Sequence, residues 1–536
     1  MRQLFLITAL LLLIGGHALA SKEYTVGVPP DWVVPLQPDL DFEVPTDQTS
    51  DGVYYLLSDR QIRAEGQNTH SYSHYAATAF NVTGIESIAN VDIAFNPAYQ
   101  TLTLHSIRVI RNGTAIEKLH NAEVRILQRE PDLERLIFDG RKTAHVFLDD
   151  VRQGDIVEYA YSLRGRNPVF GERHFGMLRL GWGVPVRHVY SRLLLPTGHD
   201  LSVVARNTEL KPLVRQRGSQ QEYVWEQRDV APIKVENNAP AWYQPHAQIQ
   251  WSAYPDWPAV ARWAAPLYAV PATSARLRQV IDSIAASSSD DETRLLAALR
   301  FVQSQIRYLG VEVGVGSHRP SHPDVVLERR FGDCKDKTLL LMTLLDGLGI
   351  EAHAALVDTE GTRILREQLP TPGAFDHVLV RARLNGVDYW LDPTFNPQGG
   401  TLATLHQPNH AYALVVDPKA GDLVAMASPS RPLPRVSIHS MIDSRAGFDA
   451  PASYTIATTA ENGAADRQRQ ALASRSHLEL QNNYLNFYAN RYPDIRVAAA
   501  LEVSDDEQQN RITLTERYQI DTLWQPSDKP GRMAAN

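Results

Sequence analysis

The sequence predicts a multidomain α+β protein with an N-terminal all-β, sandwich-like domain, a central α+β core and a C-terminal β-rich region. The 536 residues, of which 43% are hydrophobic and 21% charged, are typical of a globular protein and leave room for about three domains. Hydrophobic residues alternate at strand spacing up to about residue 236 and recur at helical spacing beyond residue 271. The net charge of −8, without a long basic run, argues against nucleic acid as a partner.

Residues 1–20 are predicted to be a secretory signal peptide. Arg2 precedes an apolar run over residues 4–14, and Ala18-Leu19-Ala20 fits a small-x-small cleavage site. The alternative, an uncleaved membrane anchor, is disfavoured because the run is shorter than the ~20 residues of a spanning helix. We therefore expect an exported, periplasmic protein with no stable membrane span after cleavage.

Short alternating runs separated by turn residues predict the all-β domain over residues 45–236. The clearest run covers residues 101–110, and Asn112-Gly113 directly after it is a strong hairpin signal. Further strands are predicted at residues 143–148, 156–163, 186–195 and 223–225.

Residues 237–270 are predicted to be a connector rich in Trp and Pro, whose tryptophans we expect to pack on a neighbouring domain. The central domain is predicted over residues 271–400. Its first long helix follows a capping box formed by Ser289 and Glu292. A second helix, from near Cys334 to Gly347, is apolar on almost all sides and should be buried at the centre of the domain.

Strands are then predicted at residues 352–357, 377–384 and 387–391. Residues 401–536 are expected to form a β-rich region with one polar helix over about 464–491. Its last residues, from Trp524 on, have no structural pattern.

Cys334 is the single cysteine, so the chain cannot form an internal disulfide. An unpaired thiol in an exported protein is easier to understand if its reactivity is used, although a buried cysteine can also serve as a small hydrophobic residue. Gly332 can supply a turn and Asp333 a helix cap, which places the thiol in the first helical turn. There the helix dipole, with Lys335 or Lys337 nearby, favours the thiolate, and free backbone N–H groups could receive an oxyanion.

A histidine and an aspartate are predicted to share one face of a hairpin. Asn385-Gly386 is a two-residue turn signal, which places Leu384 opposite Val387. In this register His377 and Asp392 are diagonal neighbours, about 7–8 Å apart at their backbones, on the face that also carries Leu379 and Thr394. A thiol, an imidazole and a carboxylate are the groups that nucleophilic acyl transfer requires.

Three sequence blocks resemble the signatures of the transglutaminase-like superfamily: residues 332–337 around Cys334, residues 374–378 around His377, and residues 389–394 around Asp392. Residues 306–312, together with Arg319-Pro320, resemble the bacterial branch in which this domain follows a β-rich module, the domain of unknown function 3857. The chain before Asn237 and the connector resemble that module. Similar proteins commonly continue past the point where this chain stops, so the C-terminal region is a candidate for being incomplete.

The resemblance implies a papain-like α+β core in which Cys334, His377 and Asp392 form a catalytic triad. The leading hypothesis is an exported cysteine-dependent acyl-transfer enzyme, a peptidase or a transamidase, that acts on protein or peptide substrates in the cell envelope. The alternative is a cell-envelope binding or scaffolding protein whose triad is idle. No cofactor or metal is expected, because the pairs His70/His74 and His318/His322 lack further ligand partners. The sequence leaves the substrate, the oligomeric state and the choice between hydrolysis and transamidation open.

Overall fold

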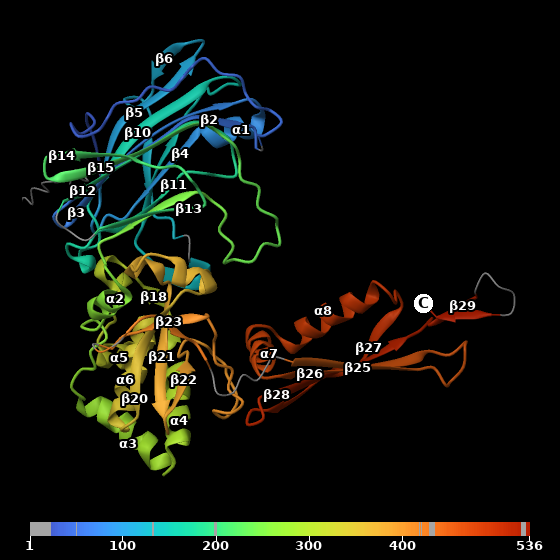
Figure 1. The fold of residues 1–536 in the computed structure, drawn as a ribbon. Coiled ribbons are helices and arrows are strands. Elements are labelled where there is room, and N and C mark those ends of the chain that lie inside the picture. Colours follow the sequence, from blue (N-terminus) through green and yellow to red (C-terminus); the bar gives the residue numbers. More distant parts are fainter. Residues whose placement is uncertain are drawn as a thin grey trace, which may run out of the picture.

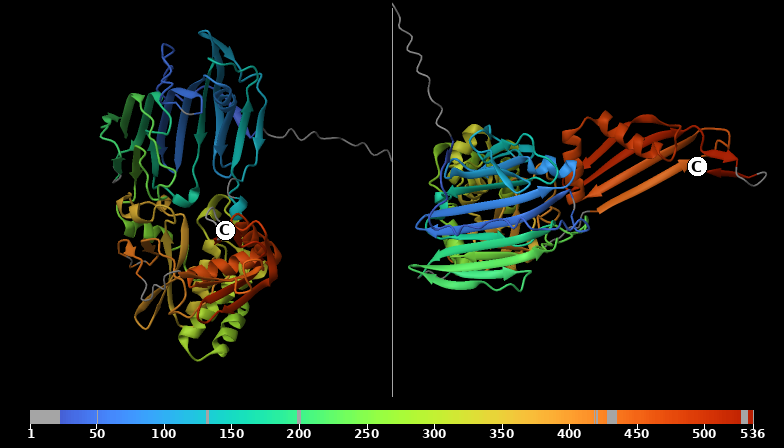
Figure 2. Two further views of the ribbon diagram at one scale, coloured as in Figure 1. Left: turned by 90° about the vertical axis from the view of Figure 1, so that its right-hand side faces the viewer. Right: turned by 90° about the horizontal axis from the view of Figure 1, so that it is seen from above.

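The structure is a computed structural model that describes residues 23–49, 51–130, 133–197, 201–417, 419, 421–427, 435–526 and 532–535 (Figure 1). The predicted signal peptide lies outside the described residues. The chain forms an N-terminal β domain, a central α+β domain beneath it and a C-terminal lobe that extends away from both (Figures 1 and 2). No helix among the described residues is long and apolar enough to cross a membrane.

The N-terminal domain is built on one large sheet and two small ones. The large sheet has the order β1-β5-β10-β3-β2-β12-β15-β14, with β6 paired to β5. Its strands are β1 (Tyr24–Val26), β2 (Val53–Glu65), β3 (Asn68–Ala79), β5 (Thr101–Arg111), β6 (Thr114–Glu117), β10 (Ile156–Arg164), β12 (Val186–Pro196), β14 (Leu213–Arg217) and β15 (Gln220–Val230). The strands predicted from alternation are present, and so is the hairpin at Asn112-Gly113. One short helix, α1 (Val82–Ile88), was not predicted.

The two small sheets share hydrophobic cores with the large one. One consists of β4 (Asn90–Phe95), β9 (Lys142–Phe147) and β7 (Val124–Leu127). The other consists of β11 (Phe175–Arg179), β16 (Gln248–Ser252) and β13 (Ser202–Arg206). The arrangement is layered, with sheet packed on sheet.

The segment predicted as a connector instead belongs to two domains. Gln248–Ser252 forms β16, so Trp251 lies in a β-domain core. Trp257 begins helix α2 (Trp257–Ala264) and packs in the core of the central domain. Both tryptophans are buried, as expected of anchoring side chains, but they anchor the segment to different cores.

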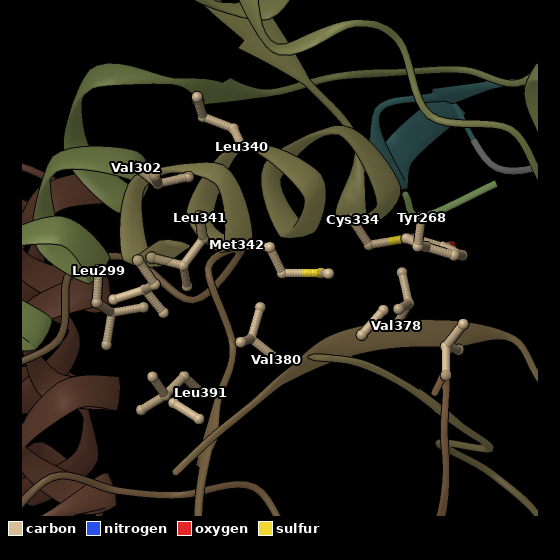
Figure 3. Packing of buried hydrophobic residues seen from close by; sticks show 14 of the residues in the cluster. Tyr268, Leu299, Val302, Cys334, Leu340, Leu341, Met342, Val378, Val380 and Leu391 are labelled. Carbon is tan, nitrogen blue, oxygen red and sulfur yellow. The ribbon is translucent and has the colours of Figure 1, made fainter. Parts of the chain in front are cut away.

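The central domain places one buried helix against an antiparallel sheet. The sheet order is β22-β21-β20-β23-β24, with strands β20 (Glu351–Val357), β21 (His377–Leu384), β22 (Val387–Leu391), β23 (Tyr412–Val415) and β24 (Val424–Ala425). Helix α6 (Cys334–Gly347) packs on β20 and β21 with one side and on α3 (Ala275–Ser287), α4 (Asp291–Gln305) and α5 (Pro323–Arg329) with the others. This position explains why α6 is apolar on nearly every side. Figure 3 shows Leu341 and Met342 of α6 packed near Val380 and Leu391 of the sheet.

The hairpin register agrees with the prediction. Leu384 pairs with Val387, and Val380 pairs with Leu391. Asn385 and Gly386 both have positive φ, 52° and 77°, as a type I′ turn requires. The cap of α4 differs from the prediction, because Asp290 rather than Ser289 accepts the hydrogen bonds of the first turn.

The C-terminal lobe is a four-stranded sheet with two helices. Its order is β25-β26-β28-β27, with β25 (Arg435–Asp443), β26 (Ala452–Glu461), β28 (Arg511–Ile520) and β27 (Ile495–Asp506). The single helix predicted over 464–491 is two helices, α7 (Gly463–Ser474) and α8 (His477–Ala489), because Ser476 caps a new helix. The tail predicted to lack structure forms a short pair, β29 (Trp524–Pro526) with β30 (Met533–Ala535).

The burial of α6 generates a prediction about stability. Leu340 is fully buried in α6, and its replacement by Ala should destabilise the central domain by about 2–5 kcal/mol through lost contacts and the resulting cavity. Leu478 on α8 is 67% exposed, so Leu478→Ala is a matched control that should change stability by about 0.5 kcal/mol or less. Calorimetry of the full chain resolves the shift in unfolding. Equal effects of the two substitutions would contradict the central position of α6.

Candidate active site

The segment from Gly332 to Lys337 places Cys334 in the first turn of α6. The Asp333 side chain accepts hydrogen bonds from the backbone N–H groups of Lys335 and Asp336, at 2.9 and 3.1 Å. The Asp336 side chain accepts in return from the backbone N–H of Asp333, which completes a capping box. A side chain at Gly332 would come within 2.6 Å of Asp336 Cβ, so glycine is required there. The hydrogen bonds of residues 332–337 therefore fix the start of α6 and with it the position of Cys334.

The two lysines of this segment have different positions. Lys335 lies beside the thiol, and its Nζ is 2.8 Å from Glu312 Oε1 and 2.8 Å from Asp333 Oδ2. Lys337 is directed towards the end of α4 and donates to the backbone carbonyl of Ile306 at 2.6 Å. Burial lowers the pKa of Lys337 to about 8, although the charge of Asp392 opposes the shift. Of the two lysines expected to act near the thiol, only Lys335 lies in the same cavity.

His377 and Asp392 meet at the start of β21, as the hairpin register predicts. His377 Nε2 is 3.0 Å from Asp392 Oδ2. The other carboxylate oxygen of Asp392 accepts from the hydroxyl and the backbone N–H of Thr394, at 2.6 and 2.8 Å. Because Nε2 is engaged by Asp392, Nδ1 is the ring nitrogen left for the contact with Cys334. Leu379, expected on the same face, lies in a separate hydrophobic cluster with Trp390.

The electrostatics of the site favour a protonated imidazole. Burial alone would lower the pKa of His377, but the charge of Asp392, its hydrogen bond and the contact with Cys334 raise that pKa well above its ordinary value. Burial tends to raise the pKa of Asp392, yet the His377 charge and the hydrogen bonds from His377 and Thr394 lower it overall. The arrangement is that of an ion pair next to a thiol.

Cys334 and His377 line a cavity of about 310 Å³ between the β domain and the central domain. The β domain contributes one wall, made of Asn96, Tyr99, Ile137, Asp139 and Arg141. Asp139 Oδ2 holds Arg141 Nε at 3.0 Å, and the Arg141 side chain remains 60% exposed. Part of the surroundings of the thiol therefore comes from two segments that lie more than 190 residues earlier in the chain.

The two domains are joined next to this cavity. Strand β8 (Ile137–Phe138) of the β domain pairs in parallel with β18 (Gly310–Val311) of the central domain. The backbone N–H of Glu312 donates to the carbonyl of Phe138 at 2.7 Å, and Glu312 in turn binds Lys335. A second bridge runs from the Asn167 amide to the Gly314 carbonyl, at 2.8 Å. These bonds fix the β-domain wall relative to the thiol.

Three further residues of the site escaped the sequence interpretation. Gln303, buried on α4, donates to the backbone carbonyl of Asp392 at 3.0 Å and so holds the backbone that carries the carboxylate. Glu312 anchors Lys335, and the aromatic ring of Tyr268 lies beside Cys334 (Figure 3). The only available signal was the presence of Glu312 in the segment that follows residue 306; nothing in the sequence connects Gln303 or Tyr268 to the cysteine.

The histidine pairs considered as metal ligands have other roles. His74 Nε2 is 2.8 Å from Glu158 Oε1 within the β-domain sheet. His318 lies in the cavity wall and bonds Ser317 through Nδ1, whereas His322 caps α5. Within the described ranges, no group of three or more His, Cys, Asp or Glu side chains is placed to hold a metal ion.

One protein family matches part of the β domain. Residues 66–234 match the family described as a domain of unknown function with a solved structure, DUF3857. No curated protein matches the chain. The crystal structure of a putative protease from Parabacteroides distasonis is 13% identical, with a TM-score of 0.58 over 88% of this chain and 94% of that one. The chain therefore shares its overall α+β fold with that protein.

Two other solved structures match a smaller part of the chain. A putative cysteine protease from Cytophaga hutchinsonii is 11% identical over 41% of this chain and 75% of its own, with a TM-score of 0.19. A TGase is 12% identical over 41% of this chain and 53% of its own, also with a TM-score of 0.19. Scores at this level do not indicate a shared arrangement.

The ion pair of His377 and Asp392 generates a prediction about pH. The raised pKa of His377 stabilises the fold fully below the unfolded value of ~6.5, and this stabilisation is lost as pH rises through the folded pKa. The lowered pKa of Asp392 stabilises above its unfolded value of ~3.9 and is lost as pH falls. A double-mutant cycle of His377→Gln and Asp392→Asn should therefore give a coupling on the order of 1–3 kcal/mol between pH 5 and 6.5.

The coupling is expected to decrease steadily as the pH is raised from 6.5 towards 10. The free energy of unfolding of the four proteins, measured in urea at each pH, provides the test. A coupling that grows with pH would contradict the assignment of a charged imidazole.

Proposed function

We propose that this protein is a cysteine-dependent acyl-transfer enzyme of transglutaminase-like type that acts on amide bonds of protein or peptide substrates. The observation that carries the proposal is that Cys334 and His377 line one cavity and that Asp392 binds the His377 ring, although the chain separates the three residues by as many as 58 positions. The same three residues lie in blocks that resemble the superfamily signatures. The overall fold shared with a protein described as a putative protease is consistent with this class.

The chemistry assigned to each residue follows from its contacts. The His377 imidazolium carries the proton that the Cys334 thiol has given up, and the thiolate attacks the substrate carbonyl. The C–N bond of the amide then breaks, the imidazolium gives its proton to the departing amine, and an acyl thioester remains on Cys334. Asp392 holds the ring through Nε2 and stabilises its positive charge. Water or a second amine then takes the acyl group, which makes the protein a peptidase or a transamidase.

The β domain is proposed to position the substrate. Its residues Ile137, Asp139 and Arg141 line the same cavity as Cys334. A bound polypeptide would therefore lie between the two domains. Together with the signal-like N-terminal sequence, this supports a role in the cell envelope, where protein or peptide substrates are met outside the cytoplasm.

Removal of the sulfur gives the first test of this function. With p-nitrophenyl acetate as acyl donor, the wild type should form an acetyl thioester that mass spectrometry of peptides locates on Cys334. Cys334→Ala should show no acyl-enzyme and no release of nitrophenolate above the background. Persistent turnover in Cys334→Ala would contradict the proposal.

The imidazole provides the second test. An ordinary thiol, with a pKa of ~8.5, is almost wholly protonated at pH 6, whereas a thiol paired with an imidazolium is not. Iodoacetamide should therefore alkylate the folded wild type at pH 6 at least about tenfold faster than His377→Gln. His353→Gln is the matched control, because His353 lies on β20 and does not line the cavity.

A wild-type thiol that reacts no faster than the His377→Gln thiol would instead favour the scaffolding alternative, in which the triad is idle.

A further inference from the structure

The backbone N–H of Cys334 is left without a partner by the cap of α6. The Asp333 side chain accepts from the N–H groups of Lys335 and Asp336, and the Asp333 carbonyl accepts from Lys337. No hydrogen bond to another described residue is found for the N–H of Cys334 itself. This donor lies next to Sγ at the positive end of the α6 dipole. By itself it is a common feature of helix starts.

A second unpartnered donor lies in the same cavity as the sulfur. Tyr268, just after α2, is only 5% exposed, and it lines the cavity together with Cys334 (Figure 3). Its hydroxyl has no hydrogen bond to another described residue and is not sealed from solvent, although the residue as a whole is buried. The hydroxyl is therefore available to something that enters the cavity.

The charge of Cys334 acts on this hydroxyl. Burial raises the pKa of Tyr268 well above its ordinary value, and the negative charge of the nearby thiolate raises it further. Tyr268 therefore keeps its proton at every pH at which the thiol and the imidazole exchange one. The group remains a hydrogen-bond donor throughout.

We propose that the Tyr268 hydroxyl and the backbone N–H of Cys334 together form the oxyanion hole, an inference that rests on the proposed function. When Cys334 Sγ bonds to the substrate carbonyl carbon, the π electron pair of the carbonyl moves to its oxygen. Both donors then hydrogen-bond that oxygen, and neither transfers its proton. As the tetrahedral intermediate collapses, the pair returns, the C–N bond breaks and the amine leaves with the proton of His377.

Two other polar side chains of the cavity already have hydrogen-bond partners. The Lys335 ammonium is held by Glu312 and Asp333, both at 2.8 Å. His318 is bonded to Ser317 through Nδ1, and its ring packs against Trp263 and Phe170. Tyr268, by contrast, is a buried side-chain donor of the cavity whose hydroxyl has no partner among the described residues.

The test compares two reactions of Cys334 that differ in whether an oxyanion forms. Acylation by p-nitrophenyl acetate passes through a tetrahedral oxyanion, whereas alkylation by iodoacetamide is a direct displacement at carbon. Tyr268→Phe should slow acylation by about 10- to 100-fold, comparable to or below the loss on removing one oxyanion donor in other hydrolases. Its alkylation rate, and the pH dependence of that rate, should match the wild type within about twofold.

Tyr254→Phe is the matched control. Tyr254 is also fully buried and its hydroxyl also lacks a partner, but it does not line the cavity. This substitution should leave both rates unchanged. An unfolded variant would be recognised by its melting temperature and by alkylation at the rate of the urea-denatured chain. In that case Tyr268→Gln, which keeps a donor, should recover part of the acylation rate.

The remaining outcomes overturn the inference in distinguishable ways. Unchanged acylation in Tyr268→Phe would remove Tyr268 from the oxyanion hole while leaving the proposed function intact. An equal loss in both reactions would show that the hydroxyl acts on the thiolate rather than on the oxyanion. A wild type that is not acylated at Cys334 would refute the proposed function itself, and this inference with it.

Discussion

The constraint on which the candidate site depends is the burial of the charged first turn of α6. Asp333, Lys335, Asp336 and Lys337 are all buried, and each must find a partner because an unpaired charge in a protein interior is strongly unfavourable. Their partners come from different parts of the chain: Glu312 for Lys335, Arg329 and Ser321 for Asp336, and the end of α4 for Lys337. Because these four side chains are held by their partners, the first turn of α6 and the cysteine within it are held in place.

The hairpin that carries the imidazole and the carboxylate is also held by hydrogen bonds to its polar groups. One carboxylate oxygen of Asp392 bonds His377 and the other accepts from Thr394, while the Gln303 amide of α4 donates to the backbone carbonyl of Asp392. Helix α4 thus touches both halves of the site, at Asp392 through Gln303 and at Lys337 through the carbonyl of Ile306 that follows it. Helix α4 therefore holds helix α6 and the β21–β22 hairpin in fixed positions relative to each other.

Local patterns were enough to predict the central helix and the hairpin register. A type I′ turn determines which residues are paired, so Asn385-Gly386 sufficed to bring His377 and Asp392 together. The sequence also predicted the first and last residues of β21 and β22. It failed where the answer depends on contacts between distant segments. Trp251 and Trp257 look alike in sequence, yet one joins a β sheet and the other begins a helix. The β-domain wall and Tyr268 likewise reach the site only through tertiary packing, which periodicity does not encode.

The parallel pair of β8 with β18 has a consequence for how such a protein can diversify. In the proposed reaction the groups that move protons all belong to the central domain, whereas Asn96, Tyr99 and Arg141 line the cavity from the β domain. Side chains on that wall can change their size or charge without disturbing the imidazole or its carboxylate. If the proposed reaction holds, selectivity and reactivity belong to separate domains, so mutations of the β domain can change which substrates enter without altering the chemical step.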